Sequence, residues 1–292
     1  MIRYDRKHGR GGVCGRWFGF GLVVASVLIG TQSVAAETSI LVQSTTSTKN
    51  SGLYDHLLPL IKRDTGIALK VVAVGTGQAI RNARNCDGDI LLVHAKSAEQ
   101  EFVADGYGVS RSDLMYNDFV IVGPAQDPAG IGGGQDAKVA LAKIAASKAL
   151  FASRGDDSGT HKAERRLWAK TDVDPTAASG TWYRETGSGM GATLNVGVGM
   201  GAYVLVDRAT WLAFGNKSDF KVLVEGDPAL FNQYGVVAVA QAKCPNVNAA
   251  AAQKVVDWLL SPTGQGAIRD YKINGMQLFF PNATHASGRA SD

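Results

Sequence analysis

Short apolar runs alternate with amphipathic segments along most of the chain, and this pattern predicts an α/β fold. The run 67–74 is typical of a buried strand, whereas Leu53, Leu57, Leu60 and Ile61 recur at the spacing of one helix face. The first five elements are ordered strand, helix, strand, helix, strand, which implies parallel strand pairing. We expect strands at 40–42, 67–74, 89–94, 115–124, 149–154 and 234–240, and helices at 51–66, 79–84, 98–106, 137–147, 247–260 and 262–274, with further helices that begin at Ser158 and Gly189.

The Gly-rich segment 127–136 predicts a surface loop, after which a second series of strands and helices begins. Two α/β lobes with a cleft between them are the natural arrangement for this order. In such sheets, ligands bind outside the carboxyl ends of the strands. Three segments that follow predicted strands would therefore meet at one crevice: 44–51 (STTSTKNS), 75–78 (GTGQ) and 153–161 (SRGDDSGTH).

The SRGDDSGTH segment ends a strand and opens a helix, so Ser158, Gly159 and Thr160 would lie at a helix N-terminus. Free N–H groups and the helix dipole favour an anion at that position, and a glycine lets the backbone come close to a ligand. Arg154 would offer a forked set of donors at the strand end, held still by Asp156. The alternative interpretation is an ordinary helix cap beside a surface ion pair.

The other two segments are also rich in side-chain donors. Five consecutive hydroxyl residues, 44–48, follow the first strand, and GTGQ offers Thr76 and Gly77 in a glycine-relaxed turn. A plain turn and a loop that happens to be rich in Ser and Thr would produce the same pattern. The prediction of a site therefore depends on the three segments taken together.

Together, these segments supply donors and one Arg, but no obvious carboxylate that would accept from a ligand. A protonated anion such as hydrogen phosphate needs an acceptor for its own O–H. A buried polar group without a partner costs about 1–3 kcal/mol. A site of donors alone therefore favours a dianion without a proton, such as sulfate, molybdate or tungstate, provided that Asp156 and Asp157 face away from it.

The sequence has no P-loop, no His-Glu-x-x-His and no Gly-x-Ser-x-Gly motif. The segment 187–192 (GSGMGA) fits a loose dinucleotide pattern, but no acidic partner follows on a strand, so we interpret it as a glycine-rich helix start. Nothing predicts a cofactor or a metal site, because His56, His94, His161 and His285 are scattered. Ser158 and His161 leave open an exported hydrolase of phosphate or sulfate esters, although no third group orients them.

The N-terminus has the pattern of a secretory signal peptide, with basic residues up to Arg16 before the apolar run 17–29. Small residues then predict cleavage after Ala36, which makes 1–36 a leader. The leader carries five of the 30 Lys and Arg residues and one of the 26 acidic residues, so the rest of the chain has 25 of each. This balance argues against a nucleic-acid partner, and no later apolar run is long enough to cross a membrane.

Several long motifs resemble the tungstate-binding proteins of bacterial ABC importers: STTSTKNSGL, VVAVGTGQAI, DILLVHAK, GYGVSRSDLMYNDFVIVGPAQDPAGI, SRGDDSGTHKAERRLW and VEGDPALFNQYGVVAV. The likeness spans residues 38–282 or thereabouts. That family's hydroxyl signature is Thr-Thr-Thr-Ser, and the run here, Ser44 to Ser47, keeps a hydroxyl at the first position. The spacing Arg-x-x-x-Ser-Gly-Thr is also similar to that of phosphate-binding proteins of the same fold.

The resemblance implies a two-lobed type II periplasmic binding protein fold with the ligand in the interlobe cleft. Lobe 1 would comprise 37–122 plus 235–285, lobe 2 would comprise 123–234, and 286–292 would be a tail. Thr76 and Gly77 enter the site by analogy of position. The resemblance places these further residues at the site: Thr45, Thr46 and Ser47 from lobe 1, and Arg154, Ser158, Gly159 and Thr160 from lobe 2.

In this type II pattern the late strand 234–240 returns to lobe 1 and runs antiparallel beside 89–94. That path would bring Cys244 towards Cys86, so we expect a disulfide between them, the alternative being two independent buried thiols. The implied function is that of a periplasmic tungstate-binding protein, not an enzyme, which acts as a monomer, needs no cofactor and serves a membrane permease. A molybdate, sulfate or phosphate binder of the same fold and the ester hydrolase remain as alternatives.

Overall fold

The computed structural model describes residues 37–284 of the chain. The predicted signal peptide, its cleavage site and the predicted tail lie outside the described residues. Within residues 37–284, no helix is long and apolar enough to span a bilayer.

The first part of the fold is built on three parallel strands, β1 (Ser39–Thr45), β2 (Ala68–Val74) and β3 (Ile90–Val93), in the order β2-β1-β3. The hydrophobic run of β3 is completely buried, as expected for a strand covered on both faces. Two long strands, β4 (Gly108–Gly123) and β9 (Phe231–Val239), continue this sheet antiparallel to each other. The strand β9 also pairs antiparallel with β3, as the resemblance implied.

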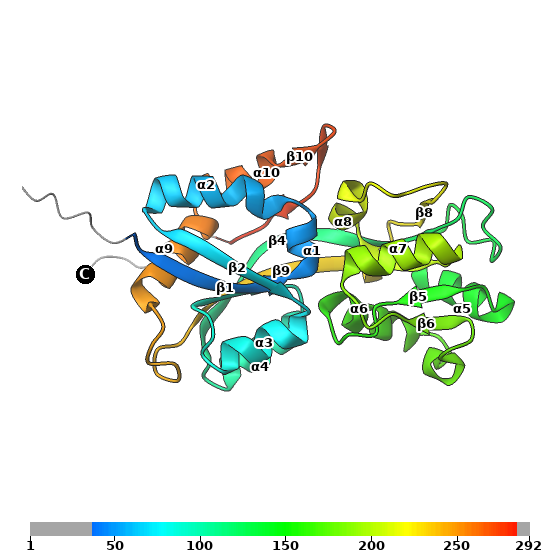
Figure 1. Cartoon of the computed structure of the whole chain (residues 1–292), viewed down its shortest axis with the longest axis horizontal. Helices are drawn as coiled ribbons and strands as arrows, with labels where there is room; N and C mark the ends of the chain where they lie inside the picture. Colours follow the sequence, from blue (N-terminus) through cyan, green and yellow to red (C-terminus); the bar gives the residue numbers. More distant parts are fainter. Residues whose placement is uncertain (1–36, 285–292) are drawn as a thin grey trace, which may run out of the picture. The chain divides into compact units, whose positions relative to one another are not determined.

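Helices cover both faces of this sheet (Figure 1). One face carries α2 (Leu53–Thr65), which buries Leu53, Leu57 and Ile61 and ends at Gly66 in the left-handed region, as the spacing predicted. The helices α9 (Ala249–Leu260) and α10 (Pro262–Asp270) pack on the same face as α2. The opposite face carries α3 (Thr76–Arg84) and α4 (Lys96–Ala104). We call this part, with its two hydrophobic clusters, the first lobe.

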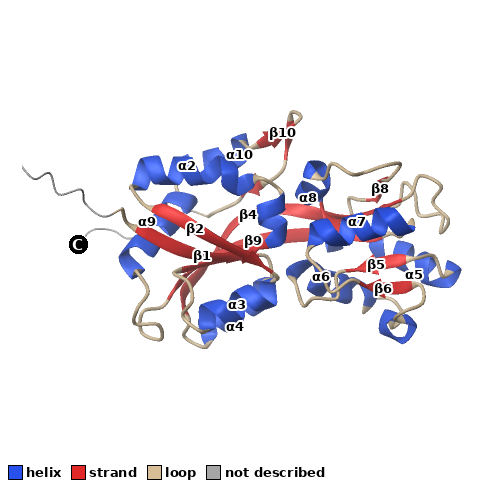
Figure 2. Cartoon of the chain, viewed as in Figure 1, coloured by secondary structure: helices blue, strands red, loops and turns tan. Residues whose placement is uncertain are grey.

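The second lobe is built on the other end of β4, which pairs there with β7 (Val204–Asp207) and β8 (Lys221–Val224). Beside them lies a separate parallel pair, β5 (Phe151–Ser153) and β6 (Tyr183–Glu185). Figure 2 shows these strands enclosed by helices. The helices of this lobe are α5 (Ala137–Ser147), α6 (Gly159–Trp168), α7 (Met190–Met200), α8 (Arg208–Ala213) and the short 3-10 turns η1 (Pro175–Ala178) and η2 (Pro228–Leu230).

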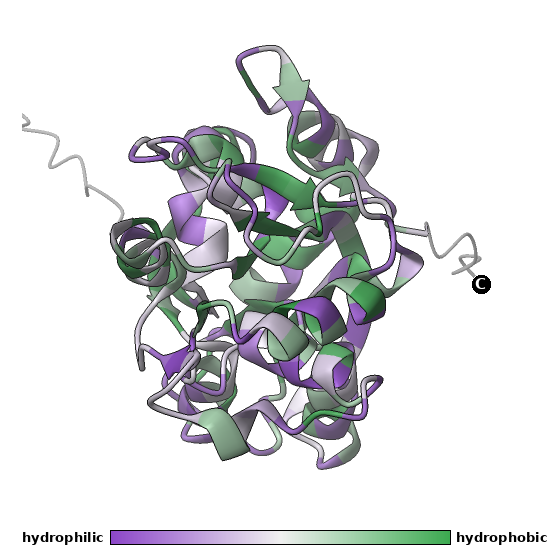
Figure 3. Cartoon of the chain, turned by 90° about the vertical axis from the view of Figure 1, so that its right-hand side faces the viewer, coloured by the Kyte–Doolittle hydropathy of each residue, from purple (hydrophilic) through white to green (hydrophobic). Residues whose placement is uncertain are grey.

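The two lobes have separate hydrophobic cores. Buried apolar residues of the first lobe come from positions 40–115 and 234–279, with Ala209 added, whereas those of the second lobe come from 119–230. In Figure 3 the hydrophobic colouring is concentrated on the strands, and the hydrophilic colouring lies on helices and loops. Both β4 and β9 run from one lobe to the other, so the chain crosses between the lobes along these two strands.

Several predicted boundaries are corrected by the structure. The hydroxyl run is not a loop, because it forms the end of β1 and the one-turn helix α1 (Thr46–Asn50). GTGQ is not a free turn either, since α3 begins at Thr76. The last predicted helix ends at Asp270, where a small hairpin and an edge strand follow. These strands are β10 (Lys272–Ile273), β11 (Met276–Gln277) and β12 (Phe280–Pro281).

The expected disulfide is present between Cys86 and Cys244, whose Cα atoms are 5.2 Å apart. Cys86 follows α3 and Cys244 follows β9, so the bond ties the returning segment to the first lobe. The two cysteines are 158 residues apart in sequence and enclose the whole second lobe. Cross-linking such a long loop restricts the unfolded chain strongly.

We expect the double substitution Cys86→Ser/Cys244→Ser to destabilise the protein by about 2–4 kcal/mol, because the unfolded chain regains the freedom that the bond removes. Urea unfolding followed by circular dichroism measures the change. Reduction of the wild-type protein should give a similar loss. Equal midpoints for wild type and the double variant would contradict a structural role.

One buried acid of the second lobe couples folding to pH. Glu164 on α6 is 1% exposed and accepts a hydrogen bond from the Tyr183 hydroxyl at 2.6 Å. Burial raises the pKa of Glu164 from its ordinary value of 4.5 to about 7. The folded protein therefore holds this proton to higher pH than the unfolded chain does.

It follows that the stability due to Glu164 is fully present below about pH 4.5 and is lost as the pH rises to about 7, with a total of roughly 3 kcal/mol. We expect Glu164→Gln to flatten this part of the stability profile, because the amide has no proton to lose. Urea unfolding at a series of pH values measures the slope, with the exposed Glu101→Gln as the matched control. An unchanged slope in Glu164→Gln would sink the assignment.

Candidate functional site

The two lobes meet where β1 and β5 end and where α3, α6 and α7 begin. The backbone N–H of Gly159, at the start of α6, donates to the Thr76 hydroxyl at the start of α3 (2.9 Å). A side-chain carbon built on Gly189, the N-cap of α7, would lie 3.6 Å from the Thr46 methyl group. Three helix N-termini and the hydroxyl run therefore converge, which makes the junction a region of positive potential with many donors.

Arg154 lies at the centre of this junction and is 2% exposed. Its Nη2 donates to Asp156 Oδ2 at 2.5 Å and to the Thr46 hydroxyl at 3.3 Å, while its Nε donates to the Ser188 carbonyl at 3.3 Å. Burial lowers the pKa of Arg154, and the charge of Asp156 opposes that change. The guanidinium is thus a buried cation fixed by both lobes.

The two acidic residues of the SRGDDSGTH segment are directed to protein donors. Asp156 Oδ1 accepts from the Ser158 N–H (3.2 Å) and its Oδ2 accepts from Arg154, so it holds the guanidinium as the sequence predicted. Asp157 forms ion pairs with Lys162 and with Arg81 of the first lobe. Each oxygen of these two carboxylates therefore already has a cation or an N–H of the protein as a partner.

The predicted hydroxyl groups are held in different ways. Thr46 and Thr76 accept hydrogen bonds across the junction, so each O–H remains able to donate. Ser47 Oγ and Thr160 Oγ1 are buried without a hydrogen-bond partner. Such groups are costly unless a ligand or water satisfies them, so they are the strongest candidates for direct ligand contacts.

Thr45 and Ser158 have local capping roles. Thr45 Oγ1 pairs with the Thr48 hydroxyl (2.8 Å) and accepts from the Thr48 N–H (3.3 Å), which caps α1. Ser158 Oγ accepts from the His161 N–H (3.2 Å), which caps α6. The cap interpretation is therefore correct for Ser158, whose own O–H still has a proton to donate.

Two glycines at the junction permit the lobes to approach closely. A side-chain carbon on Gly159 would lie 2.8 Å from both His94 Cε1 and Thr76 Oγ1. One on Gly77 would come within van der Waals overlap of Asp157 Oδ2. From the sequence we expected the missing side chain of Gly159 to let a ligand approach the backbone. In the structure, His94 and Thr76 of the first lobe occupy that space.

The Ser158 and His161 side chains do not form a nucleophile and base pair. His161 Nδ1 accepts from the Asp157 N–H (3.1 Å), and burial lowers the pKa of this imidazole. Ser158 Oγ interacts with the backbone of His161 and not with its ring. The arrangement needed for an activated serine is therefore not made by these two residues.

The sequence did not single out Ser188 and Gly189 as site residues. The carbonyl of Ser188 fixes Arg154 and also accepts from Thr193 Oγ1 (3.3 Å). The helix start at Gly189 was predicted, but its position beside Thr46 depends on how the second lobe folds. The Gly-rich pattern was the available signal, and its interpretation as a helix start is confirmed by α7.

Asp207 is a second residue that sequence reasoning missed. It ends β7, is 0% exposed, and its Oδ1 accepts from the Thr210 N–H (2.9 Å), which caps α8. Its Oδ2 has no hydrogen-bond partner. Thr210 Oγ1 in turn donates to the Ser47 carbonyl at 3.3 Å, so this carboxylate lies against the hydroxyl run.

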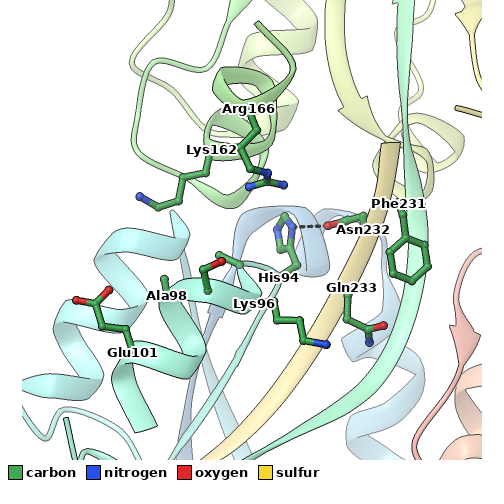
Figure 4. Close-up of a pocket in the computed structure, with 11 residues that line it drawn as sticks. His94, Lys96, Ala98, Glu101, Lys162, Arg166, Phe231, Asn232 and Gln233 are labelled. Carbon is green, nitrogen blue, oxygen red and sulfur yellow. Dashed lines mark hydrogen bonds between the residues drawn. The ribbon is translucent and has the colours of Figure 1, made fainter. Parts of the chain in front are cut away.

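A separate crevice of about 610 Å³ lies beside the junction, between α4, α6 and β9. Figure 4 shows Lys162 and Arg166 on α6 across the crevice from His94 and Lys96. His94 Nδ1 is hydrogen-bonded to Asn232 Oδ1 at 3.0 Å. Burial lowers the pKa of His94 to about 4, so this ring is neutral at neutral pH. The cationic side chains make the crevice attractive to anions in general.

No group of three or more His, Cys, Asp or Glu side chains in the described part of the chain could hold a metal ion. The junction instead offers hydroxyl groups, backbone N–H groups and a guanidinium, which are the donors that bind an oxyanion.

Comparison with known proteins agrees with this chemistry. A family model described as a PBP superfamily domain matches residues 30–263. The tungstate-binding protein TupA of Peptoclostridium acidaminophilum is 46% identical over 256 residues, which cover 86% of this chain and 88% of that protein.

Two solved structures are similar over most of the chain. The tungstate-binding protein TupA of Desulfovibrio alaskensis G20 is 48% identical with a TM-score of 0.72, covering 85% of this chain and 100% of that one. A structure described as the tungstate ABC transporter from Geobacter sulfurreducens is 46% identical with a TM-score of 0.74, covering 81% and 100%. The chain belongs to the PBP superfamily and, within it, to the family of the TupA tungstate-binding proteins.

Proposed function

We propose that this protein is the periplasmic solute-binding component of an ABC importer and that it binds tungstate as a tetrahedral oxyanion at the junction of its lobes. The observation that carries the proposal is the buried Arg154, held by Asp156 and reaching both Thr46 and Ser188. The names of the similar proteins support tungstate as the ligand. By the same comparison, the protein is a binding protein and not an enzyme.

In this proposal, the ligand oxygens accept hydrogen bonds from Thr46, Ser47, Thr76 and Thr160, and from the helix start at Gly77, while the Gly159 N–H stays bonded to Thr76. Arg154 supplies the positive charge at the site, and the hydroxyl and N–H dipoles stabilise the rest of the dianion's charge. Thr45 and Ser158 shape the site mainly as helix caps, because their oxygens already accept local N–H groups. The energetic basis is that buried donors left without partners in the protein gain them from the ligand.

We further propose that residues 37–122 plus 235–285 move against 123–234 by bending where β4 and β9 pass between the lobes. The bonds from Gly159 to Thr76 and from Arg154 to Thr46 join the two lobes, which supports the closed, ligand-holding form as the state described. An open form would break these bonds and expose the donors to water.

The donor set supports a ligand that carries no proton. Both oxygens of Asp156 accept from protein donors and Asp157 is paired with two cations, which supports the expectation that these two residues do not accept from the ligand. Molybdate has the same shape and charge as tungstate and is the second candidate. The ester hydrolase has less support, because Ser158 and His161 are not paired side chain to side chain.

The cellular setting forms part of the proposal. A signal peptide at 1–36, cleaved after Ala36, would export the chain to the periplasm, where the Cys86–Cys244 bond can form. There the closed protein, acting as a monomer, would deliver the anion to a membrane permease.

We expect Arg154→Ala to weaken tungstate binding at least tenfold, because the buried guanidinium that attracts the dianion is lost. Isothermal titration calorimetry measures the dissociation constant. Arg166→Ala is the matched control, since Arg166 lies on α6 in the crevice beside the junction and outside the donor set, and this variant should bind nearly as well as wild type. Unchanged affinity in Arg154→Ala would remove Arg154 from the site.

Thermal unfolding with four oxyanions tests the ligand class, because a ligand that binds only the folded state raises the melting temperature. We expect tungstate and molybdate to raise it strongly, and phosphate to have little effect near neutral pH, where it retains a proton. Sulfate should be intermediate. A larger shift with phosphate than with tungstate would overturn the argument from the donor set.

A further inference from the structure

One buried carboxylate next to the proposed site has no role in the binding scheme so far. Asp207 is completely buried, and only one of its two oxygens has a hydrogen-bond partner. A buried ionised carboxylate with a free oxygen is among the most costly groups in a protein interior. Its position beside an anion site makes that cost greater, because like charges repel each other.

Ser47 is the neighbour that links Asp207 to the ligand. The Ser47 hydroxyl opposes the rise in the pKa of the Asp207 carboxyl, and neither Ser47 Oγ nor Asp207 Oδ2 has a hydrogen-bond partner in the described structure. The two residues come from opposite lobes, and the bond from Thr210 Oγ1 to the Ser47 carbonyl holds them together. Lobe closure is therefore what places this serine over this acid.

The charged and titratable groups around Asp207 come from every element packed against it. Arg154, at the end of β5, is the neighbouring cation and favours the ionised form. Tyr234 on β9 has a buried hydroxyl, and the charge of Asp207 adds to the rise in the pKa of that tyrosine. On β4, Phe119 is the sheet partner of Asp207, and the preceding residue, Asp118, pairs with Arg208. Thr210 on α8 contributes an N–H and no charge.

The surroundings of Asp207 have opposing effects on its pKa. Burial raises the pKa of Asp207, and this effect outweighs the opposing ones from the Thr210 N–H and Arg154. Arrival of a dianion brings two further negative charges and also draws on the field of Arg154. Both effects favour the neutral acid in the bound state.

We propose that Asp207 takes up one proton from solvent when the oxyanion binds, and that its O–H then donates to Ser47 Oγ so that the serine O–H is directed at the ligand. The inference rests on the proposed function, since it assigns a positioning residue to the same site. The proton balance is simple: one proton leaves the buffer and is held on Asp207 Oδ2 until the ligand departs. No bond to the anion is made or broken.

Protonation explains how a carboxyl group can lie beside a site that otherwise offers only hydrogen-bond donors. The protonated acid satisfies its own free oxygen and gives Ser47 an acceptor role, leaving the serine with one proton to donate to the anion. A hydrogen-bonded chain of this kind also selects against a ligand that carries its own proton, because no acceptor remains for it. Asp207 would thus contribute to specificity without touching the ligand.

The test is calorimetric titration of tungstate into the protein near pH 7.5 in three buffers with different ionisation enthalpies. The dependence of the observed heat on the buffer enthalpy gives the number of protons taken up. We expect close to one proton per tungstate for wild type, and an affinity that falls by up to about tenfold per pH unit as the pH rises.

We expect Asp207→Asn to bind tungstate with no proton uptake and a flat pH profile, because the amide donates to Ser47 without titrating. Asp118→Asn is the matched control, since it removes a nearby carboxylate on the adjacent strand and should keep the uptake. Ser47→Ala, which removes the acceptor, should lower both affinity and uptake, and it serves if Asp207→Asn does not fold. His161→Gln tests the other titratable group near the junction and should keep the uptake.

The proposal fails if wild type binds tungstate without taking up a proton. It also fails if the uptake persists in Asp207→Asn, or if it is lost in His161→Gln. Absence of any tungstate binding by wild type is a different result, because it would overturn the proposed function itself.

Discussion

The buried guanidinium of Arg154 is the interaction on which the rest of the site depends. A cation removed from water is stable only if it is paired and its donors are used, and here Asp156, Thr46 and Ser188 meet those needs from both lobes. Asp156 neutralises only part of the positive charge of the guanidinium, so Arg154 still attracts an anion. Because Thr46 lies in the first lobe, the hydrogen bond from Arg154 to its hydroxyl also couples the closed arrangement to the site.

The fold supplies this arrangement through the ends of its elements. Parallel strands end at the same edge of a sheet, and the helices that follow them begin there with free N–H groups. In this chain β1, β2 and β5 are followed by α1, α3 and α6 in that way, and α7 adds a fourth helix start from the glycine-rich segment. Glycine at positions 77 and 159 removes the side chains that would keep the lobes apart. The two lobes have separate hydrophobic cores, so each lobe can be stable while the contacts between them change.

The junction also shows how charge is distributed around an anion site. Asp156 and Asp157 are used by protein cations and N–H groups, whereas Asp207 is buried with one oxygen free. His94, buried beside Gly159, is neutral because burial lowers its pKa. Much of the electrostatic character of the site therefore comes from groups that do not need to touch a ligand.

The sequence by itself determined the α/β order, the cap at Gly66, the helix starts at Ser158 and Gly189, and the pairing of Arg154 with Asp156. These features follow from local periodicity and from residues close together in the chain. It did not reveal β7, α8 and β8, nor that the hydroxyl run forms a helical turn. The roles of Ser188 and Asp207 were decided only by the tertiary structure, because Ser188 lies 34 residues from Arg154, and Thr210, which Asp207 caps, contacts Ser47 from 163 residues away. Contacts over such distances depend on how strands pair and lobes close, and these are properties of the whole chain that no local pattern records.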